Sequence, residues 1–252
     1  MKKKISIILP VMGKCKLCLV ESELRQSHII PEWLYKDLYD SKNRILSVQG
    51  TLGKNKTSYI QKGIRENLLC ENCENKLSKW EGYVARKFRK IKDAEVRRTK
   101  IPNLGLILIE DSDYSNVKLF QLSILWRASI SKDKLFSEVI LGKYEEKIRQ
   151  MLLSESPGSQ DFIPCSIFSV KRDSEYKFEG IFPPKKTKVG PSTNYTFYIS
   201  AWIFNFYVSE IGRPEMWNLI TIGSDNILPV GELFGEKARA LVNASWITKL
   251  FD

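Results

Sequence analysis

The sequence contains 252 residues, of which 43% are hydrophobic and 27% charged, an ordinary composition for one large globular domain or two smaller ones that argues against a disordered chain. The net charge of +11 is concentrated in one part, because residues 1–100 hold 23 Lys and Arg against 11 Asp and Glu, whereas residues 101–252 hold 17 against 18. A basic first part joined to a neutral second part favours a polyanionic partner over a merely soluble surface.

The amino-terminal segment combines a basic start with a short apolar run, as a signal peptide would. Pro10 interrupts this run, and Lys14 and Cys15 follow it in place of a small-residue cleavage site. We therefore predict a strand or a packed arm over residues 5–9. No stretch reaches the roughly 18–20 apolar residues of a membrane span, and we expect a cytoplasmic protein that has no membrane partner.

Residues 12–100 alternate between short loops and amphipathic segments. Pro31 is typical of a helix start, and the apolar residues up to Tyr39 follow it at helical spacing. Residues 41–60 contain Gly50 and Gly53 and predict a hairpin or a loop. A long helix is predicted over roughly 71–92. Its apolar face would consist of Leu77, Trp80, Val84 and Phe88.

We place a boundary near Ile101–Pro102, which divides the chain into a first part, residues 1–100, and a second part, residues 101–252. The second part is predicted to contain both helices and strands. The predicted helices are 117–131, 144–153 and 236–249, and the predicted strands are 104–110, 162–171, 176–182, 194–209 and 217–223. The expected fold class is therefore α+β, and the sequence leaves the topology of the second part open.

The most informative motif is a pair of CxxC sequences, Cys15 with Cys18 and Cys70 with Cys73. One tight turn presents two sulfurs, so two such pairs supply the four ligands of a tetrahedral Zn²⁺. The second pair opens the predicted long helix, whose free N–H groups and dipole stabilise thiolate charge. Two unrelated pairs or redox motifs are the alternatives, but a redox CxxC usually occurs singly beside a βαβ pattern. We predict a closed structural zinc site and a buried structural thiol at Cys165.

His28 is the only histidine in the chain, and it lies between the two cysteine pairs. A lone histidine is more often structural than catalytic. Its expected place on a hairpin that crosses the zinc-held helix, beside a basic surface, changes that balance. A neutral imidazole in this position can accept a proton from water.

Three segments together resemble a known family. They are CKLC at residues 15–18, SHIIPEWLY at residues 27–35 and LLCENCENKLSKWE at residues 68–81. This pattern is similar to the zinc-bound version of the HNH endonucleases, in which four cysteines staple a ββα-metal, treble-clef-like module. The resemblance covers about a third of the chain. It is also similar to a group of bacterial proteins, some of which are associated with defence against phage.

The resemblance implies roles for three residues. In the family, the histidine of the first strand is the general base that activates water against a phosphodiester, and His28 occupies this place. The residue after the last cysteine helps to bind the catalytic divalent metal, and Glu74 is a suitable oxygen ligand for Mg²⁺ or Mn²⁺. The family's middle asparagine braces the loop; Asn67 is the nearest candidate, although its spacing to Cys70 is short.

The chain departs from the family at Ser27, where the family carries an aspartate or histidine that binds the catalytic metal. A site built around Glu74 would then need a further carboxylate. Glu81 lies two helical turns away, about 10 Å along the axis, and Glu32 and Glu66 are the other candidates. Either one of these residues joins the site, or the scaffold is retained without the chemistry.

The predicted long helix also carries a dense set of basic residues, which we expect to contact the phosphates of a nucleic acid, most simply DNA, without reading its sequence. The alternative is that these basic residues form a solvent-exposed helix face without a partner. The residues are Lys76, Lys79, Arg86, Lys87, Arg89 and Lys90.

Three functions are therefore compatible with the sequence. The first is a metal-dependent HNH-type endonuclease that hydrolyses DNA. The second is a non-catalytic zinc module that binds nucleic acid. The third is a protein-interaction protein in which residues 101–252 carry the function by sensing a trigger, binding a partner or forming a homodimer. Residues 101–252 contain no histidine and no glycine-rich phosphate loop, so no catalytic constellation is predicted there.

Overall fold

The computed structural model describes residues 10–51, 54–61, 63–92, 96–101, 104–171, 180–209 and 215–234. The predicted strand or arm over residues 5–9 and the predicted helix over residues 236–249 lie outside these ranges. Most of the predicted strand over residues 176–182 also lies outside them. Ile181, which is described, forms an isolated bridge with Ile199.

The first part folds around a small antiparallel sheet. This sheet has the order β1 (Met12–Lys14), β2 (Glu21–His28), β5 (Arg65–Cys70), and α1 (Glu71–Lys92) follows β5 directly. Two short 3-10 helices, η1 (Glu32–Leu34) and η2 (Lys36–Leu38), follow β2, and a separate hairpin consists of β3 (Arg44–Thr51) and β4 (Lys54–Gln61). The hairpin over residues 41–60 and the long helix are thereby confirmed.

The second part is built on a seven-stranded sheet with the order β6-β7-β12-β8-β11-β10-β9. All neighbouring strands are antiparallel except β12 and β8, which are parallel. The bounds are β6 (Arg97–Ile101), β7 (Leu104–Ile109), β8 (Cys165–Lys171), β9 (Lys185–Val189), β10 (Ser192–Ile199), β11 (Trp202–Val208) and β12 (Leu228–Phe234). The α+β class is confirmed.

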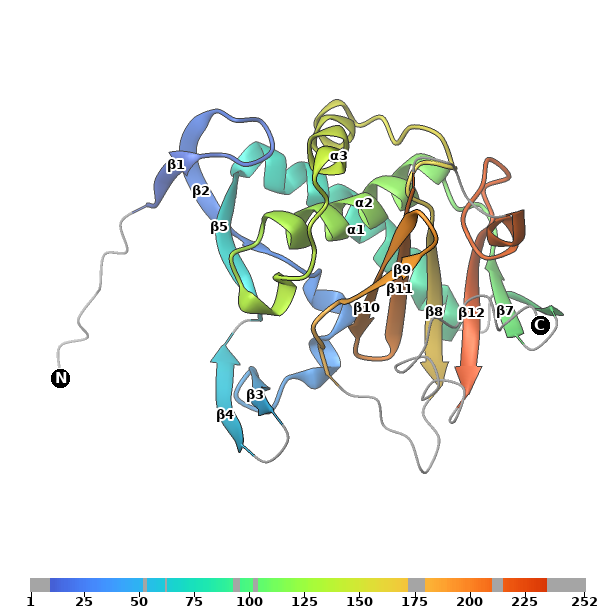
Figure 1. The fold of residues 1–252 in the computed structure, drawn as a ribbon, viewed down its shortest axis with the longest axis horizontal. Coiled ribbons are helices and arrows are strands. Elements are labelled where there is room, and N and C mark those ends of the chain that lie inside the picture. The colour runs from blue at the N-terminus through green and yellow to red at the C-terminus, as the bar shows by residue number, and fades with distance from the viewer. Residues whose placement is uncertain are drawn as a thin grey trace.

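α2 (Tyr114–Ile130) packs against this sheet, with Phe120 in contact with Phe204 of β11. α3 (Lys143–Ser154) packs against α2, and a single 3-10 turn, η3 (Lys134–Phe136), lies between the two helices in the chain. Figure 1 shows all three α-helices between the small sheet and the large one. Every residue from Val117 to Ala128 is buried, including the polar Lys118, Gln121 and Arg127, so α2 is enclosed on all sides. The side chain of Asp113 caps α2 by accepting a hydrogen bond from the backbone N–H of Asn116 at 2.8 Å.

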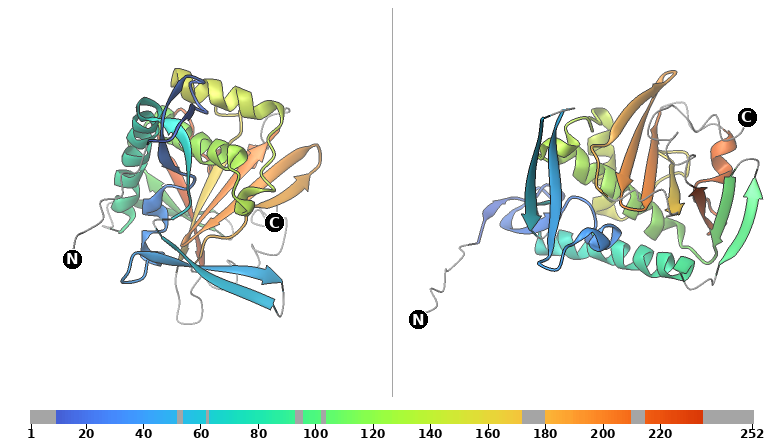
Figure 2. Two further views of the ribbon diagram at one scale, coloured as in Figure 1. Left: turned by 90° about the vertical axis from the view of Figure 1, so that its left-hand side faces the viewer. Right: turned by 90° about the horizontal axis from the view of Figure 1, so that it is seen from below.

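A single hydrophobic cluster joins the two parts. The predicted apolar face of α1 is confirmed, since Leu77, Trp80, Val84 and Phe88 are all buried in that cluster, together with core residues of α2 such as Trp126. Figure 2 shows α1 extending from the small sheet toward β6 and β7. The predicted boundary at residue 100 falls inside β6, which belongs to the large sheet. The division into two domains stays a prediction.

Three local predictions are corrected. The segment after Pro31 is not one α-helix but η1 and η2, because the chain breaks at Tyr35 (φ −133°), where Leu34 and Tyr35 are both buried. The predicted strand 194–209 is a hairpin that turns at Ser200, which has a positive φ of 50°. That turn carries no Gly or Asn to reveal it.

The predicted strand over residues 217–223 is mostly a 3-10 helix, η4 (Glu215–Leu219). Trp217 within η4 and Ile220 directly after it are both buried, and a 3-10 turn places residues three apart on the same side. Strand pairing in this segment is limited to an isolated bridge between Thr221 and Ser166. In the described residues no helix is both long and apolar enough to traverse a lipid bilayer.

Candidate metal centre and the histidine beside it

The four predicted cysteines converge on one point. The sulfurs of Cys15, Cys18, Cys70 and Cys73 all lie within 4.8 Å of one another, and no sulfur forms a disulfide. The Sγ atoms of Cys18 and Cys70 are 3.8 Å apart. Four ligands at the usual Zn–S distance of about 2.3 Å in a tetrahedron lie about 3.8 Å from one another. The cluster can therefore hold a metal ion of this kind.

Local backbone geometry explains why each pair presents two sulfurs. In the first pair, the backbone N–H of Leu19 donates to the carbonyl of Cys15, and Leu19 has a positive φ of 63°, which tightens the turn. The N–H of Lys16 donates to the carbonyl of Leu68, so the turn is fastened to β5. In the second pair, Cys70 is the last residue of β5 and Cys73 lies in the first turn of α1.

Hydrogen bonds from the backbone favour the thiolate form of one cysteine. Burial by itself would raise the pKa of Cys15, but backbone N–H groups of Cys18 and Cys70 outweigh it and lower that pKa to about 7. Burial raises the pKa of the Cys73 thiol, and hydrogen bonding among the cysteines adds to the effect. A cation bound among the four sulfurs would instead lower the pKa of Cys73, because thiolates are the metal-binding form.

The ββα unit brings Ser27 and Glu74 together. Ser27 is fully buried, and its hydroxyl donates to Oε2 of Glu74 at 2.7 Å. Ser27 lies next to the end of β2, and Glu74 is in the first turn of α1. Glu74, the predicted ligand of the catalytic metal, is therefore hydrogen-bonded to Ser27, the residue at which the chain departs from the family pattern.

His28 has a different neighbour. Successive side chains of a strand point to opposite faces, so His28 lies on the face of β2 away from Ser27. Its Nε2 atom is 3.8 Å from Oε2 of Glu32, and its side chain is 20% exposed. The other carboxylate oxygen of Glu32 accepts a hydrogen bond from the Tyr39 hydroxyl at 2.7 Å and lies 3.7 Å from the Arg65 guanidinium. At 3.8 Å this contact is longer than a hydrogen bond, so Glu32 lies beside the imidazole as a nearby charge.

The other candidate carboxylates are engaged elsewhere. Glu66 accepts hydrogen bonds from the Ser131 hydroxyl and from the backbone N–H of Lys132 at 3.0 Å. Glu81 forms an ion pair with Arg127 at 2.7 Å. Burial raises the pKa of Glu81, and the Arg127 guanidinium opposes that rise. In the described part of the chain, the four cysteines form the only group of three or more potential metal ligands.

Two further residues singled out by the sequence analysis differ in exposure: Asn67 lies at the surface and Cys165 in the core. Asn67 is exposed on β5 and pairs with Gln26, so it lies on the same face of the hairpin as His28. Cys165 is 2% exposed, which confirms a buried thiol, and burial raises its pKa.

The predicted basic residues of α1 separate into two groups. Lys76 donates to the carbonyl of Leu153 at 2.7 Å, and Lys87 donates to the carbonyls of Glu110 and Asp111, so both connect α1 to the second part. Burial lowers the pKa of Lys87, and the charge of Lys90 lowers it further. The remaining residues are Lys79, Arg86 and Arg89, which are exposed, and Lys90, which is half-buried.

Two arginines of the second part support the site, and sequence analysis did not single them out. Arg127, on α2 and 1% exposed, donates to the backbone carbonyl of His28 at 2.7 Å while pairing with Glu81. Arg149, on α3, donates to the carbonyl of Leu17 in the first cysteine turn. The signal for Arg127 was a cation inside a largely apolar helix, which has to find a partner when buried.

Comparison with known proteins adds no relationship: no protein-family model matches the chain, and neither a curated protein nor a solved structure is similar to it.

Proposed function

We propose that the chain is a zinc-stapled, metal-dependent nuclease of the HNH type that hydrolyses phosphodiester bonds of DNA, in a reducing compartment such as the cytoplasm. The supporting observation is the contact between Ser27 and Glu74 at 2.7 Å. It joins the residue next to His28 to the first turn of the helix that carries Glu74, while the His28 side chain lies on the opposite face of β2. The four-cysteine cluster at the other end of the same unit supports a structural Zn²⁺.

In this proposal, His28 accepts a proton from the attacking water, and the Glu32 carboxylate lies 3.8 Å from its Nε2 atom. Glu74 would hold a Mg²⁺ or Mn²⁺ ion, and Mg²⁺ sites often use only one or two carboxylates together with waters and substrate phosphate. Such an ion, when bound, supplies charge stabilisation for the pentavalent phosphorus. Asn67, on the same face of the hairpin as His28, would brace the loop, as the resemblance to the family implies.

The second candidate is a zinc module that binds nucleic acid without cleaving it. One observation favours it: Glu66 and Glu81 are already bonded to other groups, and Glu74 belongs to no group of three or more potential metal ligands among the described residues. This candidate uses the exposed basic residues of α1 and requires no catalytic ion.

Loss of the imidazole separates the two candidates. We expect His28→Ala to lower the rate of plasmid nicking in Mg²⁺ or Mn²⁺ by at least about 100-fold, because a general base contributes about 10²–10⁴ in rate. Glu74→Gln should also lower it, whereas Cys165→Ser, far from the proposed chemistry, should not. Zinc content and melting temperature of each variant identify folding defects. Equal nicking by wild type and His28→Ala would discard His28 as the base. DNA binding without cleavage in any divalent metal would select the non-catalytic candidate.

Removal of exposed charge from α1 should weaken DNA binding in a salt-dependent way. For the double variant Lys79→Gln/Arg86→Gln, we expect the slope of log K against log salt to decrease by about 2 in magnitude, because each phosphate contact contributes about 0.9. Fluorescence anisotropy with a labelled duplex between low and moderate salt measures this slope. Lys134→Gln, an exposed lysine of the neutral second part, is the matched control and should leave the slope unchanged. An unchanged slope in the double variant would exclude this face as the DNA contact.

A further inference from the structure

A separate cavity lies where the two parts of the chain meet. Its volume is about 500 Å³, within the range of about 300–1,000 Å³ typical of small-molecule sites. η1, η2 and α1 form one side, and β8 with the turn between β10 and β11 forms the other. No zinc ligand lines it, and neither His28 nor Glu74 does.

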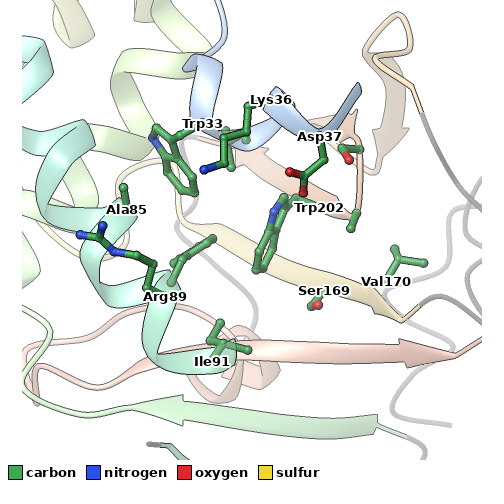
Figure 3. A pocket seen from close by; sticks show the side chains of 13 residues that line it. Trp33, Lys36, Asp37, Ala85, Arg89, Ile91, Ser169, Val170 and Trp202 are labelled. Carbon is green, nitrogen blue, oxygen red and sulfur yellow. The ribbon is translucent and has the colours of Figure 1, made fainter. Parts of the chain in front are cut away.

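Aromatic rings form the walls of this cavity. Figure 3 shows the indoles of Trp33 and Trp202 on two sides of the opening. Phe88 lies between them, with its ring centroid 5.4 Å from Trp33 and 4.5 Å from Trp202. Phe120 stacks on Trp33 from within the core at 5.9 Å. The walls are therefore rigid planar surfaces that the hydrophobic core holds in place, which suits a planar aromatic ligand.

Charged side chains define the rim. Lys36 and Arg89 line the cavity from η2 and α1, and Asp37 is the single carboxylate among the lining residues (Figure 3). A quaternary ammonium ligand does not suit this cavity. Lys36 and Arg89 would repel its positive charge, and an aromatic cage for such a ligand needs a much smaller volume. The excess positive charge instead favours a ligand with an anionic group, and Asp37 can accept hydrogen bonds from amino or hydroxyl groups.

We propose that this cavity binds a nucleotide, with the base stacked against Trp202 or Trp33 and the phosphate held by Lys36 and Arg89. The shared chemistry is a planar base attached to a phosphate. Its source is either a free mononucleotide or an unpaired nucleotide of a single strand. The proposal does not rest on the nuclease proposal, because the lining residues and those of the candidate catalytic site are different.

The test is isothermal titration calorimetry of the full chain with AMP, GMP, CMP and UMP, and separately with adenosine, ribose 5-phosphate and eight-nucleotide single strands. We expect at least one mononucleotide to bind about 10-fold more tightly than adenosine or ribose 5-phosphate, since each of these lacks one of the two contacts. Binding only by the single strands would identify the strand as the source, provided that the Trp202 variants also weaken it.

Variants make the assignment specific. Trp202→Ala should weaken binding by at least about 10-fold, and Trp202→Phe, which keeps a ring and guards against a folding defect, should weaken it less. Arg89→Gln should weaken AMP but not adenosine. Lys134→Gln removes an exposed cation that does not line the cavity and should change neither. The proposal is overturned if none of the probes binds at millimolar concentration, or if Trp202→Ala and Arg89→Gln both bind as wild type.

Discussion

Replacement of Cys73 by alanine is expected to abolish retention of the metal ion and to unfold the first part of the chain. Cys73 is 4% exposed, and its sulfur is one of four that lie within 4.8 Å of one another. A structural zinc ion contributes an apparent binding free energy of about 10–16 kcal/mol in small zinc modules. Loss of one ligand forfeits much of this energy and leaves the remaining thiolates repelling one another.

Cys165→Ala is the matched control, because it also removes a buried thiol, but one outside the cluster. It should retain about one zinc per chain and lose only about 1–2 kcal/mol, the cost of a small cavity. Elemental analysis gives the zinc content, and circular dichroism during urea unfolding gives the stability. A strong chelator should reproduce the effect of Cys73→Ala on the wild type. A wild-type chain that is stably folded without metal would contradict the expectation.

The second large effect is expected at Arg127. This side chain is 1% exposed and joins three segments, through Glu81 on α1, the carbonyl of His28 at the end of β2 and the carbonyl of Ser123 on its own helix. Arg127→Met should lower the free energy of unfolding by about 3–5 kcal/mol, because it leaves the Glu81 carboxylate partly buried without its partner.

The surface pair of Arg25 and Glu23 provides the matched control. Their nitrogen and oxygen are 3.0 Å apart, but both side chains are more than 40% exposed. Arg25→Met should therefore cost less than about 1 kcal/mol in urea unfolding.

A double variant tests the physical reason for the Arg127 effect. If the uncompensated carboxylate causes the loss, Arg127→Met/Glu81→Leu should recover part of the stability, since apolar residues of similar size often replace a buried ion pair at little cost. Additive losses in the double variant would show that the hydrogen bond to His28, rather than the unpaired charge, dominates. In either case, Arg127→Met removes the hydrogen bond by which the second part of the chain holds the backbone of the candidate base, His28.

Local patterns in the sequence were sufficient for a large share of the fold. The three-and-four spacing of apolar residues identified α1 and its buried face, and the helices around residues 117–131 and 144–153 follow from similar spacing. The cysteine spacing was sufficient to predict the four-sulfur cluster, because a CxxC turn and a helix start each fix two sulfurs by backbone geometry alone. These features depend on residues that are close in sequence.

The remaining features depend on contacts between distant residues, which only the tertiary structure decides. β12 lies between β7 and β8 in the sheet. It pairs parallel with β8 and antiparallel with β7, and both of these strands lie about 60 or more residues earlier in the chain. Glu32 is only four residues from His28, so their proximity is local, but the engagement of Glu66 by Ser131 and of Glu81 by Arg127 depends on residues of the second part. The aromatic cavity arises because a turn at Ser200 carries Trp202 against Phe88. The sequence by itself therefore determined the four-cysteine cluster and the helices, whereas the contact of Arg127 with the histidine backbone required packing between the two parts.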